Sequence, residues 1–278
     1  MDRYAVIGHP IKHSKSPIIH TAFARQTQQE LSYQALLAPL DGFSDTVQTF
    51  RAGGGRGLNV TVPFKLEACM LATRLTARAE AAGAVNTLTF NGDIIVGDNT
   101  DGVGLVRDLI VNLACPPAGR RVLLLGAGGA ARGVILPLLQ AKPSVLTIAN
   151  RTVSRARDLR AAFVDHVGQA LFTAGGFEDL EGWEFDIVIN ATSASLENET
   201  PPLPDDIFAP GAFAYDMMYS AGDTPFLAAA RAMGVTRLAD GLGMLVEQAA
   251  ESFALWRGVR PNSASVLSKL RRKLAAPT

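Results

Sequence analysis

One stretch of the chain has the spacing of a phosphate-binding turn. Residues 126–133 read GAGGAARG, so Gly126, Gly128 and Ala131 follow the pattern G-x-G-x-x-A directly after an apolar run. In this pattern the first glycine permits a tight turn, the second lets a pyrophosphate approach the backbone, and the small third residue lets a helix pack on a strand. The N-terminus of that helix attracts the anion. The stretch therefore predicts a dinucleotide site, with a purely structural turn as the alternative.

The residues after the next predicted strand indicate which dinucleotide binds. In NAD-binding proteins an acidic residue about 20 positions further on bonds the ribose diol. This chain has Asn150 and Arg151 there, with Arg155 one helical turn further on. Because a guanidinium pairs with a phosphate through two parallel hydrogen bonds, the basic residues favour NADP(H) over NAD(H). An exposed basic start of a helix is the alternative.

A lysine and an aspartate are candidates for handling a proton. A nicotinamide enzyme that reduces a carbonyl needs a group that supplies or takes up the proton, such as His, Tyr, Lys or a carboxylate. Lys65 follows a strand-like run and a proline, and Asp98 and Asp101 lie in the segment VGDNTDG. A lysine serves in this role when its surroundings favour the neutral amine, and a neighbouring aspartate can orient it. A solvated surface charge is the alternative for Lys65, and composition alone does not decide.

The first hundred residues are predicted to alternate between strands and helices. The run 3–8 is a predicted strand, and residues 64–82 are predicted to be one helical stretch. A hairpin is predicted over residues 84–101, because Asn91-Gly92 between two apolar runs is a strong turn signal. These elements would position Lys65 and the aspartates near the ends of strands.

From residue 102 onward the pattern is that of strands separated by crossover helices. Two predicted helices, about residues 242–257 and 263–274, close the chain. This alternation indicates an α/β fold with a parallel sheet. Since 278 residues exceed the usual size of one domain, two domains are expected.

Composition argues against several other classes of protein. Hydrophobic residues make up 48% and charged residues 19% of the chain, which is ample for a core and argues against disorder. Lysine plus arginine and aspartate plus glutamate number 26 each, so bulk charge predicts neither a nucleic-acid nor a membrane partner. Two cysteines are too few for a disulfide framework. Because the start does not resemble a signal peptide, we expect a cytoplasmic protein. The sequence predicts no metal site.

Nine ordered segments together resemble the shikimate dehydrogenase family. The resemblance extends over essentially the whole chain. It implies an N-terminal α/β substrate domain, residues 1–101 and 241–278 with the returning C-terminal helices, and an NADP-binding Rossmann domain, residues 102–240. The segments are HSKSP (13–17), GLNVTVPFK (57–65), GAVNTL (83–88), GDNTDG (97–102), GAGGAARG (126–133), NRT (150–152), INATS (189–193), YDMMY (215–219) and DGLGMLVEQAAESF (240–253).

The resemblance also implies a role for each site residue. It makes Lys65 and Asp101 the catalytic pair. The implied substrate-binding residues are Ser14 and Ser16 for the carboxylate, assisted by Thr61 and Tyr219, and Asn59, Asn86 and Gln248 for the ring hydroxyls and keto oxygen. The implied cofactor-binding residues are Gly126, Ala127, Gly128, Gly129, Ala130, Asn150, Arg151, Thr152, Arg155, Thr192, Ser193, Met217, Gly241 and Met244.

The implied activity is the reversible, NADPH-dependent reduction of 3-dehydroshikimate to shikimate, a step of aromatic amino acid biosynthesis. Lys65, paired with Asp101, would supply the proton as hydride arrives from the nicotinamide. The expected partners are therefore the small-molecule substrate and NADP(H), and the expected assembly is a monomer or homodimer. Two alternatives stay open: a dehydrogenase that also uses quinate, and a non-catalytic NADP-binding sensor that kept the fold.

Overall fold

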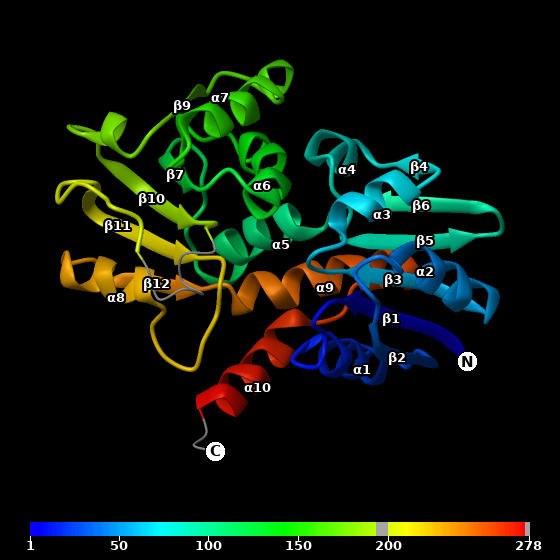
Figure 1. Ribbon diagram of the computed structural model, residues 1–278. Helices are drawn as coiled ribbons and strands as arrows, with labels where there is room; N and C mark the ends of the chain where they lie inside the picture. The colour runs from blue at the N-terminus through cyan, green and yellow to red at the C-terminus, as the bar shows by residue number, and fades with distance from the viewer. Residues whose placement is uncertain (193–199, 276–278) are drawn as a thin grey trace. The chain divides into compact units, whose positions relative to one another are not determined.

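The computed structural model describes residues 1–192 and 200–275 (Figure 1). They form two compact units, each with its own six-stranded sheet. The chain passes from one unit to the other within the helices α5 (Asp101–Arg107), α9 (Leu242–Arg257) and α10 (Ser263–Ala275). Unit 1 comprises Met1–Gly104 and Val246–Ser268, and unit 2 comprises Leu105–Leu245 and the residues from Lys269 on.

The sheet of unit 1 is mixed and has the strand order β2-β1-β3-β5-β6-β4. Strands β1, β2 and β3 are parallel, whereas β5 runs antiparallel to both β3 and β6. One end of this sheet therefore brings together the carboxyl ends of β1, β3 and β6 and the amino end of β5. We call it the carboxyl end of the sheet. The strands are β1 (Asp2–Gly8), β2 (Leu31–Leu37), β3 (Gly55–Val60), β4 (Arg74–Leu75), β5 (Thr87–Asn91) and β6 (Ile94–Asp98).

Apolar residues bury both faces of the central strands of unit 1. Four successive residues of β3, Gly57–Val60, are buried, which is typical of a strand covered by helices on both faces. Phe43 and Phe64 stack with ring centroids 4.9 Å apart within this core. The helices of the unit, besides its parts of α5, α9 and α10, are α1 (Ser16–Gln26), α2 (Phe43–Ala52), α3 (Lys65–Leu71) and α4 (Ala77–Ala82).

The prediction of one helical stretch over residues 64–82 is wrong. The short strand β4 separates α3 from α4 and pairs in parallel with β6. Thr76 then starts α4 by accepting a hydrogen bond from the backbone N–H of Ala79, and Gly83, with φ of 57°, ends it. The apolar and alanine-rich pattern favours helix locally, but pairing with a strand about twenty residues away overrides it.

The sheet of unit 2 is parallel throughout and confirms the predicted α/β fold. Its order is β12-β11-β10-β7-β8-β9, so chain order reverses between β7 and β10 (green to yellow in Figure 1). This is the strand order of the doubly wound dinucleotide-binding fold, in which ligands bind at the reversal, beyond the carboxyl ends of the strands. The strands are β7 (Arg121–Leu125), β8 (Val145–Ala149), β9 (Leu171–Gly175), β10 (Phe185–Asn190), β11 (Phe208–Asp216) and β12 (Arg237–Asp240).

Sequence patterning explains most of unit 2 but not its edge strand. Val122–Leu125 are fully buried, as expected for a central parallel strand. Strand β9 was not predicted, because it lies half-exposed at the edge of the sheet and lacks the continuous apolar run of a central strand. The helices α6 (Gly129–Gln140), α7 (Val153–Ala161) and α8 (Pro225–Ala232) connect the strands. No helix within residues 1–192 and 200–275 is long and apolar enough to cross a membrane.

Candidate active site

Lys65 and Asp101 face each other in unit 1, although 36 residues separate them in sequence. Lys65 is the first residue of α3, just beyond the fully buried ring of Phe64. Asp101 is the first residue of α5, after the loop that leaves β6. The Nζ of Lys65 donates a hydrogen bond to Oδ2 of Asp101 at 2.6 Å, and the two side chains are 24% and 11% exposed. Because water is partly excluded, the two charges attract each other more strongly than they would on an open surface.

Asn86 holds the second oxygen of the Asp101 carboxylate. It directly precedes β5, and its Nδ2 donates to Oδ1 of Asp101 at 2.8 Å. Its own Oδ1 accepts a hydrogen bond from the backbone N–H of Thr100, also at 2.8 Å. Since a backbone N–H can only donate, this bond identifies the oxygen end of the amide. Both oxygens of Asp101 are thus engaged, and its carboxylate is fixed in one orientation.

Asn59 brings a second buried amide to the same carboxyl end of the sheet. It lies in β3, opposite Thr87 of β5, and is 6% exposed. Its Nδ2 donates to Oγ1 of Thr87 at 3.1 Å, and its Oδ1 accepts a hydrogen bond from the hydroxyl of Tyr33 at 2.7 Å. Such contacts hold the amide in place before any ligand binds.

The loop that carries Ser14 and Ser16 follows β1 and therefore begins at the carboxyl end of the sheet. Ser16 begins α1, and its backbone N–H donates to Oγ of Ser14 at 3.3 Å. Thr61 follows the neighbouring strand β3. A Cβ on Gly8 would come within 2.4 Å of the Thr61 methyl carbon, so the chain at the end of β1 packs directly against the chain at the end of β3. The Ser14–Ser16 loop, which is predicted to bind the substrate carboxylate, and the Lys65–Asp101 pair therefore lie at the same carboxyl end of one sheet.

Gln248 and Tyr219 come from the later part of the chain. Gln248 lies in the part of α9 that belongs to unit 1, and its Oε1 is 3.4 Å from the hydroxyl of Thr100. Tyr219 belongs to unit 2, where burial, together with the charge of Asp240, raises the pKa of its phenol. Unit 1 alone therefore assembles all the predicted substrate residues except Tyr219.

Asp98, the other aspartate of the GDNTDG segment, has a different partner. Arg78 donates two hydrogen bonds to the Asp98 carboxylate, from Nε at 2.6 Å and from Nη2 at 2.8 Å. The Thr76 hydroxyl donates a third at 2.6 Å. Arg78 also contacts Glu251 of α9 at 3.2 Å. Burial by itself would raise the pKa of Asp98, but the hydrogen bonds and charge of Arg78 outweigh burial, so the pKa is lowered. This cluster links α4 and β6 to α9 and thereby supports the loop that leads from β6 to Asp101.

Replacing Arg78 with alanine should destabilise the protein by about 3–5 kcal/mol at neutral pH, because it leaves a buried carboxylate without its cation. A depressed pKa means that the stabilising contribution is present above the ordinary value of 3.8 and is lost as the pH falls through the folded-state pKa of Asp98. The stability difference between parent and variant should therefore narrow in acid. Urea unfolding at several pH values measures it. Arg231→Ala, which breaks the exposed pair with Asp223, is the control and should change little.

The glycine turn, Gly126–Ala130, joins β7 to α6 in unit 2. Gly126 has a φ of +104°, which residues with a side chain rarely adopt, and a Cβ there would lie 3.1 Å from the Thr192 side chain. At Gly128 and Gly129, by contrast, a Cβ would meet no described atom within 4 Å. Packing within the described chain does not demand glycine at these two positions, whereas a ligand that approaches the backbone does. Gly128 at the N-cap of α6 has no side chain that could cap the helix, so the first N–H groups of α6 suit an anion.

Two arginines follow the next strand of unit 2. Asn150 leaves β8 and donates from Nδ2 to the backbone oxygen of Thr152 at 2.9 Å. Arg151 and Arg155, the latter in the first turn of α7, are exposed. Neither forms an ion pair with any residue that the structure describes. Two guanidinium groups that have no ion-pair partner among residues 1–192 and 200–275 lie at the end of this strand and suit a phosphate on the adenosine ribose.

The loops after β10 and β11 carry the other predicted cofactor residues. The Thr192 hydroxyl donates to Oδ1 of Asn190 at 2.7 Å, and the backbone N–H of Met217 donates to the Asn190 carbonyl at 2.9 Å. A Cβ on Gly241 would lie 2.1 Å from the Met217 carbonyl oxygen, so close packing requires glycine there. The remaining members of the set are Met244, buried in α9, and Ser193, which lies outside the described residues.

The sequence prediction missed several residues whose hydrogen bonds orient the predicted site residues or the loops that carry them. Thr100 and Asn190 lie inside segments that the prediction used, so their positions were visible even though their roles were not. Tyr33 carries no local signal, because its bond to Asn59 spans 26 residues. The missed residues are Tyr33, Thr87 and Thr100 in unit 1, and Asn190, Asp216 and Thr224 in unit 2.

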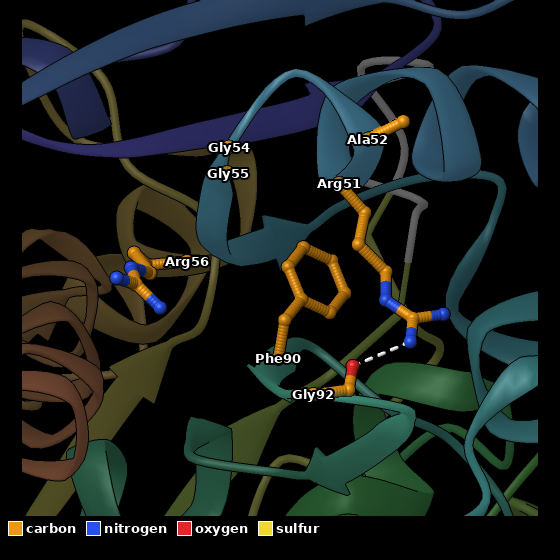
Figure 2. A pocket seen from close by; sticks show the side chains of 7 residues that line it. All are labelled: Arg51, Ala52, Gly54, Gly55, Arg56, Phe90 and Gly92. Atoms are coloured by element: carbon orange, nitrogen blue, oxygen red, sulfur yellow. Dashed lines mark hydrogen bonds between the residues drawn. The ribbon is translucent and has the colours of Figure 1, made fainter.

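A surface hollow of about 420 Å³ lies at the opposite end of the unit 1 sheet (Figure 2). It is lined by the start of β3 and the β5–β6 turn, and Arg51 and Arg56 flank Phe90 in this view. Arg51 donates to the Gly92 carbonyl and pairs with an aspartate at 3.3 Å, and Arg56 has an aspartate at 3.6 Å. Since both guanidinium groups already have partners, we assign no role to this hollow.

A parallel dinucleotide-binding sheet in one unit and a partly buried Lys–Asp pair in the other define a class, the nicotinamide-dependent oxidoreductases of the Rossmann type. Comparison with known families narrows the class. Models described as the shikimate dehydrogenase substrate binding domain, shikimate / quinate 5-dehydrogenase and the shikimate 5'-dehydrogenase C-terminal domain match residues 6–88, 112–198 and 241–271. The chain belongs to the shikimate dehydrogenase family, as its motifs predicted.

Individual relatives agree with the family models. The NADP(+) shikimate dehydrogenase of Aromatoleum aromaticum is 66% identical over 274 residues, which cover 99% of this chain and 98% of that protein. The solved structure of an Ael1 enzyme from Pseudomonas putida has a TM-score of 0.93 and 53% identity, covering 100% of this chain and 99% of that one. Shikimate 5-dehydrogenase from Thermus thermophilus, solved with NADP(H) and shikimate, has a TM-score of 0.86 and 33% identity, covering 99% and 100%.

Proposed function

We propose that this protein catalyses the reversible, NADPH-dependent reduction of 3-dehydroshikimate to shikimate, in aromatic amino acid biosynthesis. The observation that carries the proposal is the 2.6 Å hydrogen bond between Lys65 and Asp101, at the carboxyl end of the sheet where the Ser14–Ser16 loop also lies. The names of the relatives support it, since they are NADP(+) shikimate dehydrogenases at 58–66% identity. The Thermus thermophilus structure contains both NADP(H) and shikimate.

The residues of unit 2 fit NADP(H). Backbone groups at Gly128 and Gly129 are open to a pyrophosphate, and Arg151 and Arg155 are free to bind a 2′-phosphate. Asn150 and Thr152 complete the loop that would hold this phosphate, with Thr192, Ser193, Met217, Gly241 and Met244 toward the nicotinamide. When bound, the cofactor supplies the hydride.

The residues of unit 1 would bind and orient the substrate. The hydroxyls of Ser14 and Ser16, with Thr61 and Tyr219, would donate hydrogen bonds to its carboxylate. Hydroxyl donors hold an anion less tightly than a bidentate arginine does, which lets the product leave. Asn59, Asn86 and Gln248 would bind the ring hydroxyls. A site built to bond hydroxyls strongly rejects analogues that lack them.

Lys65 would move the proton. Negative charge grows on the ketone oxygen during reduction, and the ammonium of Lys65 stabilises it and then transfers a proton to it. Asp101 would hold the ammonium in position and accept a bond from a ring hydroxyl. In the reverse direction the neutral amine of Lys65 would take the proton from the shikimate hydroxyl.

The proposal divides the work between two parts of the chain. Residues 1–101 and 241–278 would form the substrate domain and residues 102–240 the cofactor domain. We propose that the protein works in the cytoplasm on small molecules, as a monomer or homodimer. Size-exclusion chromatography with light scattering distinguishes the two assemblies.

The decisive experiment follows NADPH absorbance after addition of 3-dehydroshikimate. We expect saturable oxidation of NADPH, and much weaker activity with NADH. The reverse reaction, with NADP⁺ and either shikimate or quinate, tests the broader activity that the matched shikimate / quinate 5-dehydrogenase model raises. Binding of NADPH without turnover of any such acid would refute the proposal and favour a sensor.

A further inference from the structure

Tyr33 ends a chain of hydrogen bonds that begins at Lys65. All members belong to unit 1, and they come from strands, helices and loops far apart in sequence. The links are Lys65 Nζ to Asp101 Oδ2 at 2.6 Å, Asn86 Nδ2 to Asp101 Oδ1 at 2.8 Å, Thr87 Oγ1 to Asn86 Oδ1 at 2.9 Å, Asn59 Nδ2 to Thr87 Oγ1 at 3.1 Å, and Tyr33 Oη to Asn59 Oδ1 at 2.7 Å.

The direction of every link follows from one backbone group. The N–H of Thr100 donates to Oδ1 of Asn86, so that atom is the amide oxygen. Thr87 gives its single hydroxyl proton to the same oxygen and must therefore accept from Asn59. The nitrogen of the Asn59 amide then faces Thr87, and its oxygen faces Tyr33, which has to donate.

This arrangement leaves one N–H of Asn59 available. Apart from Thr87, the Asn59 nitrogen contacts the Asn86 carbonyl oxygen at 3.4 Å, which is long for a hydrogen bond. That carbonyl already accepts the backbone N–H of Val60 at 2.7 Å. An incoming acceptor, such as a ring hydroxyl oxygen, can therefore take the Asn59 N–H without leaving any protein group unsatisfied.

The phenol of Tyr33 is held as a rigid donor. The His20 ring lies parallel to it, with centroids 4.1 Å apart and planes 4° from parallel. His20 is 1% exposed, and neither of its ring nitrogens has a hydrogen-bond partner in the described chain. Burial lowers the pKa of His20 to about 3, so the ring is neutral. Burial likewise raises the pKa of Tyr33 well above 10, against a hydrogen bond with Ser16.

We propose that Tyr33 is a positioning residue, whose hydroxyl locks the Asn59 amide so that a free N–H points toward a substrate hydroxyl. The inference rests on the proposed function, in which Asn59 is a substrate ligand. Tyr33 itself need not touch the substrate. Without its hydroxyl the Asn59 amide loses the bond that fixes its oxygen, and the amide can rotate to present the wrong atom.

Tyr33→Phe tests this, because phenylalanine keeps the ring and its stacking on His20. The KM for dehydroshikimate should rise about three- to tenfold, the effect of one hydrogen bond. The turnover number, the KM for NADPH and the Tm should hardly change. Tyr4→Phe is the matched control, since Tyr4 lies opposite Tyr33 on the neighbouring strand β1 and stacks on Trp256, but its hydroxyl lies 3.5 Å from Arg257 and forms no hydrogen bond with Asn59 in the described chain. It should change neither KM.

A double-mutant cycle separates positioning from packing. In the Asn59→Ala background, Tyr33→Phe should cause no further rise in the substrate KM. An unchanged KM in the single variant, equal effects in both backgrounds, or a rise in the NADPH KM together with a lower Tm would each overturn the proposal.

Nuclear magnetic resonance of the side-chain amides tests the contact without any substrate. The Asn59 NH₂ signals should shift or broaden in Tyr33→Phe and stay unchanged in Tyr4→Phe; unchanged signals in Tyr33→Phe would also overturn the proposal. A parent protein that never turns over dehydroshikimate would refute the proposed function, whereas this measurement would still report on the Tyr33–Asn59 bond.

Discussion

Replacing Lys65 with alanine should lower the turnover number by about 10²- to 10⁴-fold, the usual effect of losing a general acid. The methyl group of alanine can neither stabilise the charge on the ketone oxygen nor supply its proton. The KM for dehydroshikimate should change much less, because Ser14, Ser16 and Asn59 remain to bind the substrate. Steady-state rates from NADPH absorbance, over a range of substrate concentrations, separate the two effects.

Two controls show whether the loss is specific to proton transfer. Lys269→Ala removes an exposed lysine of α10 and should keep the parent turnover. The Lys65→Ala variant should also bind NADPH like the parent in a fluorescence titration, since the proposed cofactor residues lie elsewhere in the chain. A turnover number close to that of the parent would remove Lys65 from the proposed role.

Replacing Arg151 with alanine should weaken NADPH binding about 10- to 100-fold, the effect of losing charged hydrogen bonds to a phosphate. Binding of NADH, which lacks the 2′-phosphate, should hardly change. The preference for NADPH over NADH should therefore fall by about the same 10- to 100-fold factor. Titrations of both cofactors, followed by nucleotide fluorescence, measure this preference directly.

Arg157 provides the matched control for Arg151. It lies in α7, six positions after Arg151, and is exposed as well, but it stands outside the predicted phosphate clamp. Arg157→Ala should leave both affinities at parent values. Equal losses of NADPH and NADH affinity in Arg151→Ala would refute the assignment, since they would indicate a general effect on the fold of unit 2.

The local features of this protein could be predicted from its sequence. The glycine turn is encoded by a few neighbouring residues, since Gly126 needs a left-handed backbone and Gly128 leaves room for a ligand. The hairpin at Asn91-Gly92 is equally local, because Gly92 adopts a φ of 58° that the turn requires. The alternation of strands and helices, together with nine family segments, then predicted the α/β fold and the family.

Tertiary structure decided what depends on distant partners. Residues 64–82 form two helices rather than one, because β4 pairs with β6. Asp98 is held by Arg78, whereas Asp101, three positions further on, holds Lys65. Tyr33 meets Asn59 only because β2, β1 and β3 are neighbours in one sheet. A turn or a cap is determined by residues that are close in sequence, whereas a hydrogen bond across a sheet is determined by which strands pair and in which register, and that depends on the packing of the whole unit.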